Sequence, residues 1–152
     1  MVIEQVTYEG IELALIVRGG QKANGISFLT NPDSELQVGS MMRESGYQIA
    51  PHVHKRVHRK ICSTQEVLFV KRGFLRVDFF NDERVYLQSR LLRSGDVILL
   101  ASGGHGFEFL EDSEIIEVKQ GPYVGDSDKE RFTPVSRSEI CVQGKIGPDE
   151  TS

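Results

Sequence analysis

The feature that most constrains the fold of this chain is a series of short, strand-like runs between residues 66 and 119. Branched and aromatic residues dominate the runs, and Gly, Asn or Asp separates them, as at Arg72-Gly73, Asn81-Asp82 and Ser94-Gly95-Asp96. Almost nothing in the sequence has the spacing of an amphipathic helix. Because short strands at intervals of about 8–12 residues are typical of sandwiches and barrels, the sequence predicts an all-β fold of the jelly-roll kind.

The predicted strands follow from the same pattern. They cover residues 11–17, 35–43, 46–50, 66–71, 74–80, 85–92, 97–100, 106–110 and 114–119, with 138–142 as a further candidate. Residues 66–71 and 74–80 are predicted to pair as a hairpin, since Gly73 can take the positive φ of a tight turn. Along 74–80, the alternation predicts that Leu75, Val77 and Phe79 face the core and that Arg76 and Asp78 face water. Residues 21–33 and 51–64 are predicted loops.

The length of 152 residues fits one domain. With 39% hydrophobic and 26% charged residues, the chain has enough apolar surface for a core and is too apolar for disorder. We expect a barrel with an N-terminal strand over residues 1–125. Residues 126–152, rich in charges, Ser, Gly and Pro, are expected to form a C-terminal arm with a frayed end.

The charge of the chain argues against two classes of partner, and its apolar runs and cysteines indicate where the protein is found. The net charge of −4 is spread over mixed-sign residues, which argues against binding to nucleic acid or to an anionic membrane. No apolar run approaches the roughly 18 residues that span a bilayer, and the N-terminus lacks the pattern of a secretion signal. Cys62 and Cys141 are expected to be free thiols. A cytoplasmic protein is therefore predicted.

Three of the four histidines lie close together in the chain. His52 and His54 project from one face of an extended segment, so their imidazoles can bind one ion. The alternative is that they are ordinary surface residues. His58 lies in a basic run, residues 55–60, and is expected to face solvent. That run is either a solvated loop or a set of cations at the mouth of a pocket.

Two stretches of the sequence resemble the motifs of the cupin superfamily. In the first, Gly46 precedes His52 by six positions, and Glu66 precedes the turn residue Gly73 by seven. The second runs from Gly95 to His105. The resemblance spans residues 46–118, with an insertion at residues 55–65 and with Ala101 where a proline is usual.

The resemblance implies a single-domain cupin β-barrel, a double-stranded β-helix, that forms a homodimer. It further implies one divalent metal ion, Fe, Mn, Ni, Zn or Co, on His52, His54, Glu66 and His105. Side-chain parity adds Gln48 and Phe107 as pocket candidates. For each of the four predicted ligands there is an alternative to metal binding: the side chain lies on the surface or forms only a local hydrogen bond.

The fold alone does not determine the function, because cupin barrels carry many different enzymatic and binding functions. The resemblance suggests a small metalloenzyme acting on a polar metabolite such as a sugar or sugar nucleotide, isomerase-like or epimerase-like, in surface-polysaccharide synthesis. A non-catalytic small-molecule-binding or sensing module is the alternative, followed by an Fe(II) dioxygenase. No catalytic residue is assigned.

Overall fold

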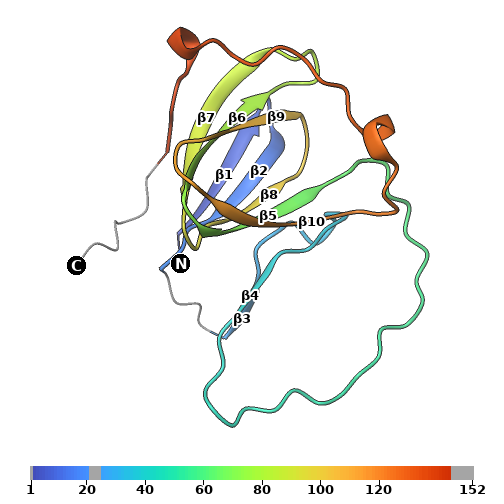
Figure 1. The fold of residues 1–152 in the computed structure, drawn as a ribbon. Helices are drawn as coiled ribbons and strands as arrows, with labels where there is room; N and C mark the ends of the chain where they lie inside the picture. The colour runs from blue at the N-terminus through green and yellow to red at the C-terminus, as the bar shows by residue number, and fades with distance from the viewer. Residues whose placement is uncertain (1, 21–24, 145–152) are drawn as a thin grey trace. The chain divides into compact units, whose positions relative to one another are not determined.

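The computed structural model describes residues 2–20 and 25–144 (Figure 1). The chain divides into two compact units. The main unit comprises residues 1–21 and 64–152, and the inserted unit comprises residues 22–63. The span predicted as one barrel, residues 1–125, therefore contains the inserted unit within it. Residues 145–152 of the predicted arm lie outside the described residues.

The main unit contains a five-stranded antiparallel sheet. Its order is β1 (Ile3–Tyr8), β2 (Ile11–Val17), β8 (Val97–Leu100), β5 (Glu66–Arg72) and β10 (Glu114–Lys119). A tight turn at Glu9 and Gly10, both with positive φ, joins β1 to β2. The turn fits a hairpin because this backbone region matches the right-handed twist of the strands.

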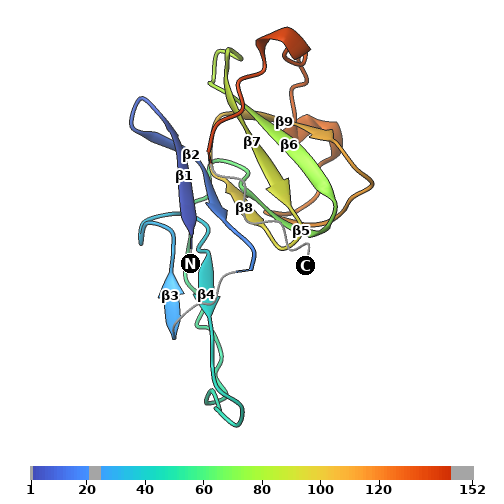
Figure 2. The same cartoon turned by 90° about the vertical axis from the view of Figure 1, so that its left-hand side faces the viewer.

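A second antiparallel sheet has three strands, in the order β7 (Tyr86–Arg93), β6 (Phe74–Phe80) and β9 (Gly104–Phe109). Figure 2 shows this sheet from a second direction. The all-β prediction is thus confirmed. Within the described part of the chain the strands form separate sheets, and their hydrogen-bonded ladders do not close into a barrel.

One hydrophobic core joins the two sheets of the main unit. Both contribute side chains that are almost inaccessible to water, among them Ile16 and Ile98 from the larger sheet and Val77 and Phe79 from the smaller. Along β6, Leu75, Val77 and Phe79 all point into this core, as their alternation predicts. The core therefore fixes which face of each strand looks inward.

The prediction of a β5–β6 hairpin is wrong. Both strands exist, but β5 pairs with β8 and β10, whereas β6 pairs with β7 and β9. Gly73 adopts a φ of 101°, as a hairpin glycine would, yet the chain uses it to pass from one sheet to the other. A turn residue specifies a change of direction, and the partner of each strand is set by packing.

Gly73→Ala should destabilise the main unit by more than about 1 kcal/mol, because alanine disfavours positive φ. A β-carbon at this position would also lie only 2.6 Å from Cα of Ser113. The comparison is Gly10→Ala, which has a φ of 81° and no atom within 4 Å of the added carbon. Urea unfolding of both variants checks this. Equal losses would mean that the contact with Ser113 does not matter.

The prediction that Arg76 and Asp78 face water is also wrong. They project from the face of β6 opposite the core, yet their exposed fractions are only 9% and 6%. They form an ion pair with each other, which satisfies charges that burial would otherwise penalise. Strand alternation correctly placed Arg76 and Asp78 on the face of β6 opposite the core, but it did not indicate that other residues cover this face.

The inserted unit contains a short hairpin, β3 (Ile26–Phe28) with β4 (Gly39–Met41). β3 falls where a loop is predicted, and the predicted strand 35–43 is reduced to three residues. Residues 46–50, predicted as a strand, have no regular structure, and neither do residues 51–63. The polar loop of the hairpin is closed by a hydrogen bond of 2.8 Å from Thr30 Oγ1 to Gln37 Oε1.

Between residues 120 and 144, the part of the chain after β10 that the structure describes, no further strand forms. Two single-turn 3₁₀ helices, Gly125–Asp128 and Arg137–Glu139, interrupt an otherwise extended path. The predicted strand 138–142 is replaced by the second of these helices and by an isolated bridge between Val142 and Ser89. Across residues 2–20 and 25–144, helices of the length and apolarity needed to cross a membrane are absent.

Candidate functional site

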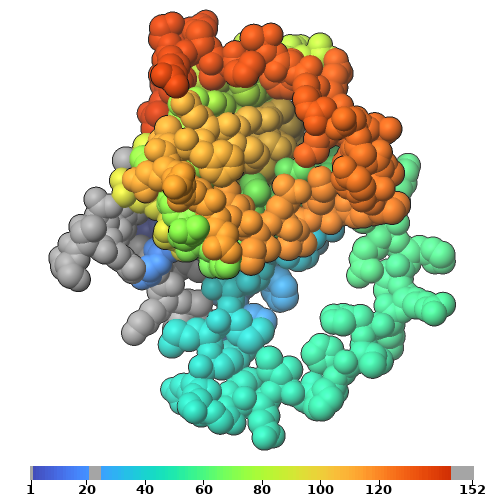
Figure 3. All heavy atoms as spheres, viewed as in Figure 1, coloured from blue at the N-terminus to red at the C-terminus, as the bar shows by residue number. Residues whose placement is uncertain are grey.

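The main unit contains a pocket of about 1070 Å³. Its walls come from β5, β6, β9 and β10 and from residues between 128 and 137. They belong to the segment 125–137, which we call the cover segment. In Figure 3 the chain after β10, coloured orange to red, borders a hollow in which green atoms of earlier strands are visible. Charged side chains of both signs and the rings of Phe80, Phe107 and Phe132 line the pocket.

Glu66 and His105 meet in this pocket. Glu66 begins β5, on the same face as the core residue Leu68, and its exposed fraction is 4%. His105 lies on β9 opposite Phe79, with 27% of its side chain exposed. Nε2 of His105 is 3.2 Å from Oε2 of Glu66. The two sheets therefore bring together an acid and an imidazole from distant parts of the sequence.

The surroundings of Glu66 favour its charged form. Its pKa lies below the ordinary value, first because of the hydrogen bond with His105 and then because of nearby positive charge. Burial acts in the opposite direction and is overcome. Two ammonium groups, Nζ of Lys129 at 3.6 Å and Nζ of Lys119 at 3.8 Å, lie near its Oε1 atom. Glu66 is therefore a buried carboxylate stabilised by cations.

Aromatic rings give the pocket an apolar component. The ring of Phe107 lies 5.5 Å from that of His105, and Phe80 and Phe132 form an edge-to-face pair with centroids 5.0 Å apart. Gly104 makes room for this pair, because a β-carbon there would lie 3.0 Å from Phe132. Phe107, a pocket candidate from the sequence, does line the pocket.

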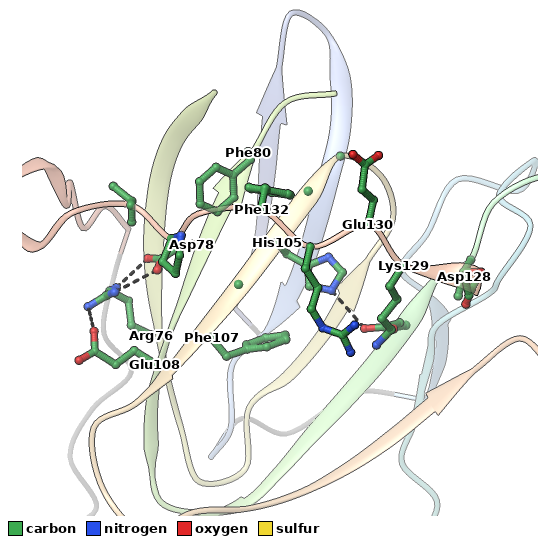
Figure 4. Close-up of a pocket in the computed structure, with 18 of the residues that line it drawn as sticks. Arg76, Asp78, Phe80, His105, Phe107, Glu108, Asp128, Lys129, Glu130 and Phe132 are labelled. Atoms are coloured by element: carbon green, nitrogen blue, oxygen red, sulfur yellow. Dashed lines mark hydrogen bonds and ion pairs between the residues drawn. The ribbon is translucent and has the colours of Figure 1, made fainter. Parts of the chain in front are cut away.

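A second group of charges lies on the other side of β9 (Figure 4). Arg76 donates to Asp78 through Nε at 2.7 Å and through Nη2 at 3.0 Å, and its Nη1 lies 2.6 Å from Oε2 of Glu108. The buried hydroxyl of Ser89 donates to Asp78 at 2.5 Å. The pKa of the Arg76 guanidinium is raised, chiefly by its hydrogen bonds to Asp78. This group is an extended, fully paired network.

The predicted ligands divide between the two units. Glu66 and His105 are together in the main unit, whereas His52 and His54 belong to the inserted unit, as does the exposed Gln48. The rings of His52 and His54 lie 5.3 Å apart, and Nδ1 of His52 is 3.0 Å from the carbonyl oxygen of Ala50. Among residues 2–20 and 25–144, no three or more His, Cys, Asp or Glu side chains gather as metal ligands.

The Glu66–His105 pair offers two donor atoms of the kind that a metal ion takes, and the described residues around the pair add no third His, Cys, Asp or Glu ligand. Adjacent ligands on an ion with bonds of about 2.1 Å lie about 3 Å apart. The 3.2 Å between Nε2 and Oε2 is close to that separation. A carboxylate and an imidazole also suit Fe, Mn, Ni, Zn and Co. Lys119 and Lys129 oppose the fit, because they already supply positive charge to the carboxylate.

Sequence reasoning missed the charged residues around this pair. Lys129 lies in a segment predicted to be an arm, and Lys119 ends a strand where a solvent-facing charge is common. A signal did exist for Arg76 and Asp78, since opposite charges two apart on a strand share a face and can pair. No such local pattern indicates Lys129, because its contact with Glu66 depends on the path of the cover segment.

Comparison with known proteins adds no relative to this description. No model of a known protein family matches the sequence, and neither a curated protein nor a solved structure matches it.

Proposed function

We propose that this chain is a cupin-type, jelly-roll protein that binds a polar small molecule at the Glu66–His105 pair, with a divalent metal ion. The observation that carries the proposal is the meeting of these two side chains in a large pocket, 3.2 Å apart. Both are residues that the cupin resemblance identifies. A pocket with converging polar groups and apolar walls is typical of a small-molecule site.

A sugar or sugar nucleotide is the ligand class that suits the lining. Charged groups of both signs can hydrogen-bond to hydroxyl groups, and phenylalanine rings can pack against the apolar face of a sugar ring. The carboxylate of Glu66 can also accept a hydrogen bond from such a ligand through Oε1, the oxygen that would not hold the ion. We propose an isomerase or epimerase before a dioxygenase, because the lining suits a ligand with many hydroxyl groups.

The metal proposal combines the observed pair with the sequence. Glu66 Oε2 and His105 Nε2 would supply two ligands, and the cupin resemblance supplies His52 and His54 as the others. When bound, the ion would polarise a carbonyl or hydroxyl oxygen of the ligand. Which of Fe, Mn, Ni, Zn and Co the protein binds is to be measured.

Metal content tests this ligand set directly. Untagged wild-type protein should contain about one ion per chain by plasma mass spectrometry. The His52→Ala/His54→Ala double variant should lose it, because each imidazole supplies one bond to the ion. His58→Ala, in the same polar stretch, is the matched control and should keep it. Metal-free wild type after reconstitution with Fe, Mn, Ni, Zn and Co would show that the ligand set is wrong.

A non-catalytic binding module is the second candidate. The cations beside Glu66 favour it, because Lys119 and Lys129 already compensate the carboxylate without an ion. Thermal-shift screening with sugar nucleotides, followed by product analysis, separates the two functions. A ligand that is bound and converted, with conversion lost in Glu66→Gln, indicates an enzyme. A ligand that is bound but never converted indicates a binding module.

We also propose a homodimer, on the cupin resemblance alone. Light scattering coupled to size-exclusion chromatography gives the mass in solution. A mass near 17.1 kDa, that of one chain, would contradict the dimer.

A further inference from the structure

Residues 52–61, which we call the basic segment, are exposed along their whole length and have no regular structure (Figure 1). The segment contains four Lys or Arg residues and no Asp or Glu. Within residues 2–20 and 25–144, no carboxylate pairs with these four cations, and the backbone amides of the segment donate no hydrogen bond. Both the charge and the backbone of the segment are therefore available to another surface.

The basic segment also has the side-chain pattern of a strand. Val53, Val57 and Ile61 lie at positions that share one face of an extended chain. Of their surfaces, 89%, 61% and 46% are exposed. Burial of such side chains is favourable, and unpaired backbone groups can form a ladder with the edge of a sheet. The segment therefore has what a strand added to a sheet needs.

The main unit has an open edge and an apolar face at β10. β10 ends its five-stranded sheet, so one of its edges has no strand beside it among the described residues. On the face of β5 and β10 that points away from the core, Ile116 pairs with Phe69, and Val118 follows. Their exposed fractions are 49%, 40% and 58%. A contiguous apolar patch of this kind marks an interaction surface.

The charge around β10 is opposite to that of the basic segment. Between Arg93 and Lys119 the sequence has six acidic residues and no Lys or Arg. Two of them, Glu111 and Asp112, lie in the turn before β10, are exposed and pair with no cation of the described chain. Opposite charges on two surfaces draw them together and select the pairing.

We propose that the basic segment of one copy adds as an antiparallel strand to the open edge of β10 in a second copy, which returns the same contact. Val53, Val57 and Ile61 then extend the apolar face of β10. Strand addition supplies backbone hydrogen bonds, and the side chains give specificity. Because one chain carries both surfaces, a two-fold axis satisfies both contacts at once.

The antiparallel direction follows the main unit, in which every pair of neighbouring strands is antiparallel. It places Arg59 and Lys60, near the end of the segment, beside Glu111 and Asp112 at the start of β10. This inference rests on the homodimer proposed above and names the surface that forms it.

Two charge-reversal variants of the full-length protein test the contact. Arg59→Glu/Lys60→Glu makes the end of the segment acidic, and Glu111→Lys/Asp112→Lys makes the turn before β10 basic. Each variant alone places like charges together in its own dimer. In an equal mixture, the mixed dimer has opposite charges at both contacts, so mixing should restore what each variant loses.

The matched control is Asp82→Lys/Glu83→Lys, because these two acids are also exposed and lie in the turn between β6 and β7 of the other sheet. Sedimentation velocity over a range of concentrations gives the dissociation constant of each dimer. Hydrogen exchange with mass spectrometry reports on residues 52–61 and 114–119.

We expect each variant to dimerise about a hundredfold more weakly than the wild type, because like charges across an interface are strongly unfavourable. The control should match the wild type, and the mixture should recover the wild-type affinity. The amides of both segments should exchange more slowly in the wild type than in either variant, because the added strand gives them hydrogen-bond partners.

Three results would overturn the inference. Variants that dimerise as tightly as the wild type would refute the contact and leave the homodimer standing on another surface. A monomeric wild type would refute the homodimer and the contact together. Weak variants that mixing does not restore would refute the exchange between copies. The metal-content measurement tests the pocket separately from all three.

Discussion

Asp78→Ala should lower the free energy of unfolding by about 3–5 kcal/mol, the usual cost of removing one partner from a buried ion pair. Asp78 accepts two hydrogen bonds from Arg76 and one from Ser89, and all three side chains are buried. Without the carboxylate, the guanidinium keeps only Glu108 as an anionic partner in this network. The loss of stability therefore comes from leaving the positive charge of Arg76 buried and only partly compensated.

Urea unfolding followed by circular dichroism measures this loss. Glu114→Ala is the matched control, since it removes the carboxylate that pairs with Lys71 and Arg72 in an exposed pair. Exposed pairs contribute about 0–1 kcal/mol. If the two variants lose similar amounts, the Arg76–Asp78 pair is hydrated in solution and the network does not support the pocket wall.

Phe79→Ala should be about as damaging, with a loss of about 3–5 kcal/mol. Its ring is 1% exposed and lies in the core that joins the two sheets. Truncation removes apolar contacts and leaves a cavity that neighbouring strands cannot fill without breaking their ladders. Calorimetric or urea unfolding measures the loss.

Phe109→Ala is the comparison for Phe79, because Phe109 ends β9 with 58% of its surface exposed. We expect it to change stability by less than about 1 kcal/mol, as for surface substitutions in general. A large loss at Phe109 together with a small one at Phe79 would mean that the core is packed differently from the structure described.

The strands between residues 66 and 119 were predictable because two local signals agree there. Alternation of apolar and polar residues in 74–80 identifies the core face, and glycine or asparagine turns mark the ends. In residues 22–63 these signals are weak. β3 and β4 have only three residues each, and Gly39 lies at the start of one, so the strand pattern there is too short to recognise.

Strand partners could not be predicted in the same way. A glycine turn between two runs favours a hairpin locally, but β5 lies between β8 and β10, with Leu68 and Val70 in the core. The buried state of Arg76 was missed for a related reason. Nothing near it in the sequence indicates that Glu108 lies beside it.

The site was predictable only as far as motif spacing reaches. The spacing of Glu66 from Gly73 and the glycines before His105 identified two residues that the structure brings together. Lys129 could not be identified, because its position depends on how residues 120–137 run after the last strand. It stays a prediction that one ligand set is formed by His52, His54, Glu66 and His105.

The passage at Gly73 has a consequence for how the chain folds during synthesis. β6 and β7 are neighbours in sequence and in the sheet, so they can pair soon after they leave the ribosome. β5 is made before both, yet its partners β8 and β10 are made after them. For that interval the strand that starts with Glu66 has both edges unpaired and an apolar face exposed, so it is open to aggregation in the nascent chain.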